Sequence, residues 1–227
     1  MRQFCLIVVV AILLQGCATT GTSTRNVEAL KFSEAHPAIA LMPLDVQLSQ
    51  LDASGLSEPK AEWTDSAKHY MHDEFEQFIR AHGISLADGS HIEDEKLVDL
   101  LSLHEAVGRA IMIHHYGVLL PTKGDTLDWT LGTEASALRN KLHADYGLFI
   151  YVRDSYSSGG RIALQILAAV AGASVQGGMQ TGFASLVDLR TGKVVWFNRL
   201  LRPTGDLRNE GPARETFETL MTGFPKI

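Results

Sequence analysis

Three side chains on one predicted helix have the types and spacing of metal ligands. His69 and His72 lie three residues apart, and Glu76 follows one turn later. On a helix this spacing places all three on one face, where imidazole nitrogens and a carboxylate could hold a zinc ion. A membrane-tethered, metal-dependent hydrolase is therefore one hypothesis, with His114 and His115 as further ligands. The alternative, which we favour, is that these side chains form the solvated face of an amphipathic helix.

Other reactive side chains lack the sequence context that catalysis requires. Ser155–Gly160 has no Gly-x-Ser-x-Gly elbow, and no glycine pair precedes the lysine and hydroxyl of a phosphate-binding loop. Asp145, Asp154 and Asp188 flank predicted strands, where carboxylates are commonly solvated. His104 lacks the second histidine, four residues later, of a metalloprotease helix. We therefore predict no catalytic residue, no bound metal and no cofactor, and we favour a non-enzymatic protein.

Among the candidate residues, Cys17 has the strongest sequence support for a chemical role, because of the segment that precedes it. Arg2 is the only charge before an apolar run over Phe4–Leu14, and small and polar residues follow that run. This is the layout of a secretory signal, and about eleven apolar residues are too few for a bilayer-spanning helix, which needs about 20. The chain has two cysteines, and Cys5 lies inside the signal. An exported chain would therefore have no second thiol with which to form an internal disulfide.

The stretch Leu14-Gln15-Gly16-Cys17 resembles the lipobox of bacterial lipoproteins, with an aliphatic residue three positions, and a small residue one position, before the cysteine. The resemblance implies that residues 1–16 are removed and that the Cys17 sulfur takes a diacylglycerol. It also implies that the new amine receives a fatty acid such as palmitate. Ala18 after the cysteine implies sorting to the outer membrane, with the domain facing the periplasm. Cys17, as the lipidation site, is the one site residue that we predict.

The rest of the chain has the composition of one packed domain. Hydrophobic residues make up 45% and charged residues 20% of the 227 residues, which is typical of a globular protein and not of a disordered one. A net charge of −6 without a dense run of Lys and Arg argues against nucleic acid as a partner. We expect residues 17–27 to be the lipidated N-terminus and a flexible tether, because Ala18–Asn26 is polar and small. Residues 28–227 would then form a single periplasmic domain.

The hydrophobic pattern predicts an α/β fold. Apolar residues at helical spacing predict helices over Ala61–Ala81, Glu93–His115 with a break near Gly108, Thr133 to the residue before Tyr146, and Glu215–Met221. Short apolar runs predict strands over Ala38–Met42 with an edge extension to Leu51, Ile84–Leu86, Leu148–Val152, Thr181–Leu189 and Lys193–Leu200. Asp52–Pro59 is expected to be a loop, Thr133 an N-cap, and Gly192 the positive-φ residue of a hairpin turn. The expected fold is a single domain with a mixed β-sheet, a C-terminal β-hairpin and helices packed on the sheet.

The strand region Ala144–Val152 and the hairpin region Ala184–Trp196 together resemble a group of outer-membrane lipoproteins. The group includes the curli-secretion channel subunit, the Pel-polysaccharide export lipoprotein and the penicillin-binding-protein activator lipoproteins. This resemblance implies an α/β periplasmic domain whose partners are copies of itself or other envelope proteins. We therefore expect a non-enzymatic interaction or assembly module, acting as an oligomer or with other envelope proteins, in an envelope assembly or export system.

An apolar insertion, Ile162 to Gly178, separates the strongest predicted strand from the hairpin. Arg161 is the only charge between Asp154 and Asp188, and small residues alternate with aliphatic ones. Such a composition permits close helix packing, and about 17 residues are at the lower limit for spanning a bilayer. The main expectation is a helix buried on the sheet or in an interface between protomers. A segment that touches the membrane or lines a pore is the alternative.

Overall fold

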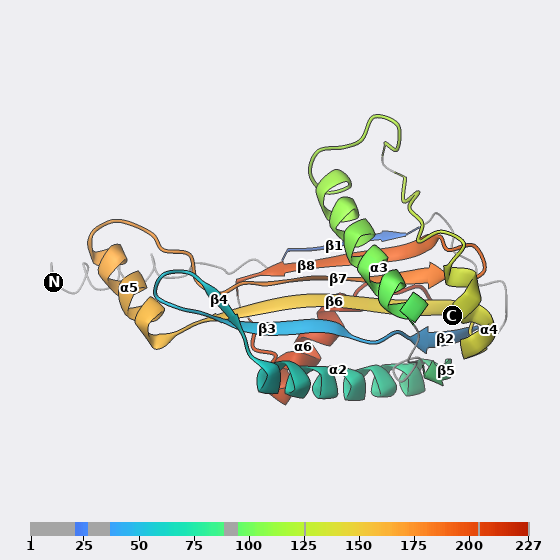
Figure 1. The fold of residues 1–227 in the computed structure, drawn as a ribbon, viewed down its shortest axis with the longest axis horizontal. Coiled ribbons are helices and arrows are strands. Elements are labelled where there is room, and N and C mark those ends of the chain that lie inside the picture. The colour runs from blue at the N-terminus through green and yellow to red at the C-terminus, as the bar shows by residue number, and fades with distance from the viewer. Residues whose placement is uncertain (1–20, 27–36, 89–94, 125, 204, 227) are drawn as a thin grey trace, which may run out of the picture.

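The computed structural model describes residues 21–26, 37–88, 95–124, 126–203 and 205–226, and its described strands form one mixed sheet. The order is β1-β8-β7-β6-β2-β5, with β3 paired to the second half of β6 and β4 paired to the end of β3 (Figure 1). The strands are β1 (Gly21–Asn26), β2 (Ala38–Leu41), β3 (Asp45–Leu51), β4 (Ser57–Pro59), β5 (Ser85–Asp88), β6 (Tyr146–Ser157), β7 (Gln180–Asp188) and β8 (Val194–Arg202). The helices are α2 (Ala61–His82), α3 (Glu95–His114), α4 (Ala135–Leu142), α5 (Gly159–Val170) and α6 (Glu210–Leu220).

Strand β6 is the longest strand and organises the sheet. Along one side it pairs antiparallel with β7, from Tyr146 opposite Asp188 to Asp154 opposite Gln180. Along its other side it pairs in parallel with β2 first and then with β3. Pro43 lies between β2 and β3, where a residue without an N–H group interrupts what would otherwise be one long strand. The chain continues from Ser157 directly into α5.

Helices cover both faces of the sheet. Helices α2 and α6 lie on one face, where Phe75 and Phe217 join the aliphatic side chains of β2, β3, β6 and β8 in a buried cluster. Helices α3 and α4 lie on the other face, and their cluster contains Phe149, Phe183 and Phe197. Figure 1 shows α3 crossing in front of the strands, while the part of the sheet between α3 and α5 has no helix in front of it.

The structure confirms the predicted fold class, a single α/β domain with a mixed sheet and a C-terminal hairpin. Helix α2 ends at Gly83, which has a φ of 63°, and the β7–β8 turn contains Gly192 with a φ of 72°. Left-handed backbone of this kind favours glycine. Helix α3 is continuous through Gly108, so the predicted break is wrong. A Cβ atom on Gly108 would lie 2.1 Å from the Phe183 ring, which shows that this glycine permits close packing and does not interrupt the helix.

Four other local predictions are wrong. Gly21–Asn26, assigned to the flexible tether, is strand β1 and pairs antiparallel with β8. The predicted loop after Asp52 contains the short strand β4, which pairs with the end of β3. The N-cap of α4 is Glu134 in place of Thr133, without a side-chain capping bond. Helix α6 begins at Glu210, earlier than predicted.

Candidate functional site

The lipidation site that we predict, Cys17, lies outside the described residues, but the strand after it fixes the direction from which the chain enters the domain. Gly21 is opposite Leu201 of β8. Leu201 is opposite Thr181 of β7, and Thr181 is opposite Arg153 of β6. The chain therefore enters the sheet at the end from which β6 runs on into α5.

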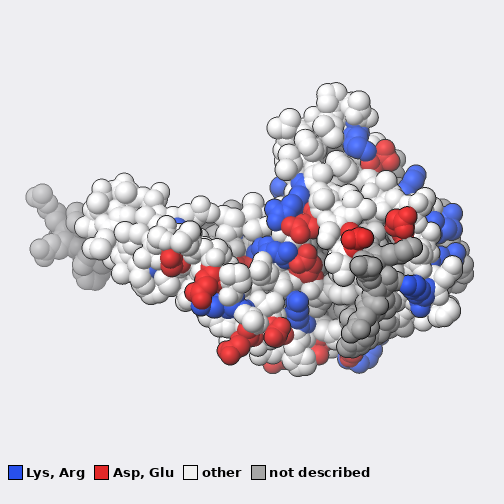
Figure 2. Space-filling model, in the orientation of Figure 1, with Lys and Arg blue, Asp and Glu red and all other residues white. Residues whose placement is uncertain are grey.

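Helix α5 and the return segment after it, residues 171–178, project from that end of the sheet as an arm (Figure 1). None of the residues of α5 is buried. Ile166, Leu167 and Val170 are 61%, 67% and 86% exposed. The expectation that this segment is buried on the sheet is therefore wrong for the helix. Figure 2 shows the arm as an almost uncharged part of the surface, whereas acidic and basic side chains mix over the rest of the visible face. No helix among the described residues has the length and hydropathy needed to cross a membrane.

The polar side chains of α5 face inward and hold the arm together. Ser158 caps the helix by accepting a bond from the Arg161 backbone N–H. The Arg161 Nε donates to the Gln176 carbonyl at 2.9 Å, and its Nη1 donates to the Asp52 carbonyl at 3.4 Å. Gln165, one turn further along, donates to the Val175 carbonyl at 3.4 Å. The one charge of the arm is therefore tied to the helix's own return segment and to the β3–β4 hairpin.

A buried polar network lies where the arm joins the body. The Asp154 carboxylate accepts bonds from the Tyr156 hydroxyl and from Gln180 Nε2, the latter at 2.8 Å. The Gln180 carbonyl oxygen in turn accepts from Arg202 Nε at 2.6 Å. Arg202 also bonds Thr216 and pairs with Glu215 of α6 at 3.0 Å, so the network joins β6, β7, β8 and α6. Burial raises the pKa of Asp154 despite these bonds.

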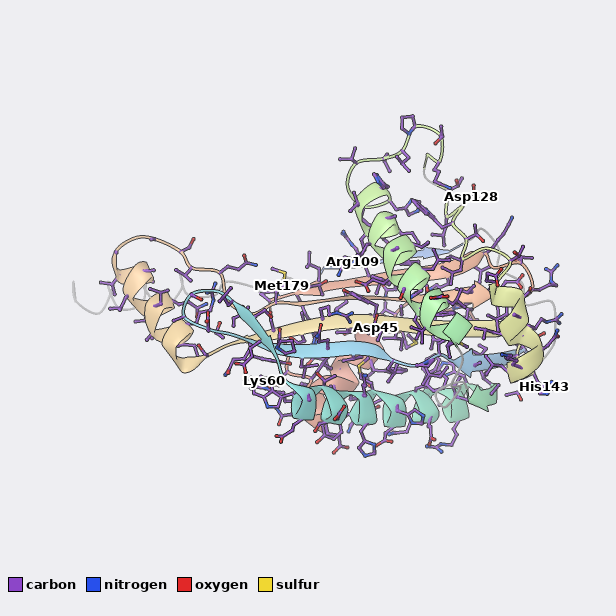
Figure 3. The ribbon with its side chains drawn as sticks, viewed as in Figure 1. Asp45, Lys60, Arg109, Asp128, His143 and Met179 are labelled. Atoms are coloured by element: carbon purple, nitrogen blue, oxygen red, sulfur yellow. The ribbon has the colours of Figure 1, made fainter. Side chains whose placement is uncertain are left out.

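A shallow groove of about 380 Å³ lies on the uncovered part of the sheet, and charged side chains line its α3 side. Arg153 pairs with Asp45 at 2.7 Å and lies 4.0 Å from the centre of the Tyr151 ring. Arg109 of α3 pairs with Glu105 at 2.9 Å and bonds the Tyr151 hydroxyl. Figure 3 labels Arg109 on α3 and Asp45 on β3. Each guanidinium group is matched by a carboxylate, so the groove does not present a concentrated positive charge to a ligand.

The structure does not assemble the predicted histidine face into a metal site. His69 is an exposed side chain 3.5 Å from Asp73, and Glu76 pairs with Arg80 at 3.3 Å. Within the described ranges no three His, Cys, Asp or Glu side chains are arranged to hold a metal ion. His114 Nδ1 donates to the backbone carbonyl of Val118 at 3.1 Å, and this histidine lies on α3 and not on α2. The described residues therefore provide no set of metal ligands for the hydrolase hypothesis.

The other candidate side chains have structural environments. Ser158 is the helix cap described above, and Ser155 bonds both backbone groups of Met179. Asp145 bonds Arg139 at 3.1 Å, and Asp188 shapes the β7–β8 turn through the backbone N–H of Arg190. Trp196 and Phe197 are buried in the core and Trp129 packs against it. The sequence gives no signal for the Asp154 network, because its central members Asp154, Gln180 and Arg202 lie 26 and 22 positions apart.

His104 is a buried histidine for which we predicted no role from the sequence. It is 3% exposed, stacks on Phe149 with ring centres 4.8 Å apart, and bonds the Ser185 hydroxyl through Nε2 at 2.7 Å. Burial lowers the pKa of His104 to about 3. Because the ring is neutral and enclosed, it contributes to the core and not to proton transfer at the surface.

Acidification should destabilise the domain through His104. The unfolded ring binds a proton below its ordinary pKa of about 6.5, and the folded ring does so only near 3, so the unfolded state gains protons first. This one group should lower the free energy of unfolding by about 2 kcal/mol between pH 7 and pH 5. Urea unfolding at both pH values should show a smaller pH dependence in His104→Gln. The exposed His69→Gln variant should keep the dependence of the unsubstituted chain; equal dependence in all three would contradict the assignment.

Comparison with known proteins gives distant structural likenesses. The chain is similar to a solved PelC dodecamer from Paraburkholderia phytofirmans, at 14% identity over 90% of this chain and 96% of that chain, with a TM-score of 0.40. A substituted form of the same dodecamer gives the same identity and coverage, with a TM-score of 0.43. No protein-family model matches the chain, and no curated protein matches it in sequence.

Proposed function

We propose that this chain is a lipid-anchored protein of the bacterial cell envelope, held through Cys17 and facing the periplasm. Its α/β domain acts as a non-enzymatic interaction or assembly module in an envelope assembly or export system. The export signal and lipobox-like sequence support the anchor. The entry of β1 at the α5 end of the sheet supports a fixed orientation of the domain relative to that anchor.

The observation that carries the assembly role is an apolar stripe on the outer face of α3. Leu103, Ala106, Ala110 and Ile113 follow one another at alternating spacings of three and four, the spacing of a helix-to-helix seam. Leu103 and Ile113 are 40% and 56% exposed. Val118, on the loop after the helix, extends the apolar surface. Contiguous apolar surface that a domain leaves in water marks an interaction site.

Pairing of this stripe with a second copy of the chain is the form of assembly that we propose. The nearby charged residues Glu105 and Arg109 are already paired with each other. A second copy therefore need not supply an opposite charge at the border of the stripe. Pairing would bury one leucine and one isoleucine from each of two copies. Because these side chains are about half exposed before pairing, each would contribute roughly half of the 1.5–3 kcal/mol of full burial.

Light scattering tests this role on the chain from residue 17 onward with Cys17→Ser, which contains every described element. We expect a mass that is a multiple of one chain at high concentration. Ile113→Asp should shift it toward the monomer, because a carboxylate would have to lose its water in the seam. Leu167→Asp, an equally large change on α5, is the matched control and should leave the mass unchanged. A monomer at every concentration would contradict self-assembly.

A further inference from the structure

The arm formed by α5 and residues 171–178 has an apolar surface that the described domain does not cover. Three α5 positions at helical spacing, Arg161, Gln165 and Ala168, are half-buried and lie against the return segment. The remaining face is aliphatic, and Ile162, Leu164, Ile166, Leu167 and Val170 are all exposed. A helix with all its polar groups on one narrow face, and no charge on the wide one, matches an apolar environment better than water.

The β3–β4 hairpin lies against the base of this helix and adds to the same surface. Ala53 is close to Gly160, since a Cβ atom on Gly160 would be 3.5 Å from the Ala53 Cβ. At Gly55, an added Cβ would be 3.0 Å from the Arg161 guanidinium. Leu56, at the tip of the hairpin, is 72% exposed. The apolar surface is therefore carried by two chain segments that Arg161 joins.

The sheet register relates this surface to the lipid anchor. Gly21 is level with Arg153, and β6 continues four positions further to Ser157, about 13 Å at the usual rise of a strand. Cys17 precedes Gly21 by four positions, and an extended chain of that length also reaches about 13 Å. A lipid on Cys17 can therefore lie at the same level as the base of α5. An anchored domain would meet the membrane with this end.

We propose that α5, its return segment and Leu56 lie on the lipid bilayer as a second membrane contact beside the Cys17 lipid. Helix α5 has 12 residues, about 18 Å, and so would lie in the interface, since a spanning helix needs about 30 Å. The side chains of Ile166, Leu167 and Val170 enter the acyl region, while Arg161 and Gln165 stay bonded to the protein. The location of the anchor rests on the proposed function; the apolar surface does not.

Vesicle flotation tests the contact without the lipid anchor, on the chain from residue 17 onward with Cys17→Ser. We expect weak, measurable binding to phosphatidylcholine vesicles, and Leu167→Asp should weaken it at least about tenfold. Because Arg161 is the only charge of the arm and is already bonded, anionic phosphatidylglycerol should add little, and salt should not release the protein. The matched control is Ile113→Asp on α3, which should bind as the unsubstituted chain does.

Tryptophan quenching tests the same contact in the full lipidated protein. A Leu167→Trp side chain should be quenched by brominated phospholipids, whereas a Val98→Trp side chain on α3 should not, each measured against the unsubstituted chain. Helix α5 has no buried residue and Val98 is 63% exposed, so both tryptophan variants should keep the thermal unfolding midpoint of the domain. Absent quenching at position 167, together with flotation that Leu167→Asp does not change, would overturn the proposal.

Two further outcomes separate this proposal from its alternatives. If Leu167→Asp converts an oligomer into a monomer and no variant floats with vesicles, a second copy covers α5 and the bilayer contact is wrong. If mass spectrometry shows an unmodified Cys17 while the unlipidated chain still floats, the anchor is wrong and the contact stands.

Discussion

Removal of the Cys17 lipid is expected to release the protein from the membrane, lowering the ratio of membrane-bound to soluble protein at least about a hundredfold. Each buried acyl CH₂ contributes about 0.8 kcal/mol, and stable anchoring requires more than one chain. The proposed α5 contact, a single short helix, cannot replace that contribution. If both proposals hold, the lipid would decide whether the protein is anchored, and α5 would affect only how the anchored domain lies.

A simple Cys17→Ser variant would keep its apolar signal, which could itself hold the precursor in a membrane. The informative variant combines Leu14→Ala, Gly16→Ala and Cys17→Ser, which create the small-residue cleavage site of an ordinary secretory signal. Signal removal then proceeds without lipidation, and fractionation should find the mature chain in the soluble periplasm. Mass spectrometry of the unsubstituted protein should show the added mass of the acyl groups; an unmodified residue 17 would refute the anchor.

Replacement of Gly108 by valine should destabilise the domain by about 3 kcal/mol or more, since overpacking of a core usually costs about 1–3 kcal/mol and here the overlap is severe. A Cβ atom there would approach three carbons of the Phe183 ring, all within 2.8 Å. That ring cannot move away easily. It stacks between Tyr151 and Phe197, with ring centres 4.8 Å and 5.4 Å away.

Ala81→Val is the matched control for Gly108→Val, because Ala81 is an exposed helical residue, on α2 and outside the stripe proposed for self-assembly. It should change the free energy of unfolding by less than about 1 kcal/mol, the cost of a β-branched residue in a helix. Urea denaturation measures both variants. In a double-mutant cycle, Phe183→Leu should recover part of the loss caused by Gly108→Val, since the two positions are in contact. Equal losses in the two valine variants would contradict a steric role for Gly108.

Elements with a strong apolar period could be predicted from sequence, and those that depend on distant partners could not. Helix α2 has apolar residues at helical spacing and a glycine at its end, so local chemistry determines it. Strand β1 has the sequence of a polar linker, and only its pairing with β8 makes it a strand. The second half of β6 was missed for the same reason: Arg153–Ser157 is polar, and pairing with β3 keeps it extended.

The environment of α5 could not be predicted, because composition does not distinguish an apolar helix that is buried from one that is exposed. Periodicity shows a wide aliphatic face, but the position of that face depends on β6 and its partner β3 extending past β7 and β8. Cys17 stays a prediction from a contiguous sequence signal, because it lies outside the described residues. The Asp154–Gln180–Arg202 network could not, since only the register of β6, β7 and β8 brings those side chains together.

The alternation of side chains along β6 has a consequence for how the domain loses its structure. Leu148, Ile150 and Val152 belong to the layer under α2 and α6, whereas Phe149 and Tyr151 belong to the layer under α3 and α4. Because one strand supplies both layers, neither can melt while the other stays intact. The domain should therefore unfold as a single cooperative unit in spite of its two separate hydrophobic clusters.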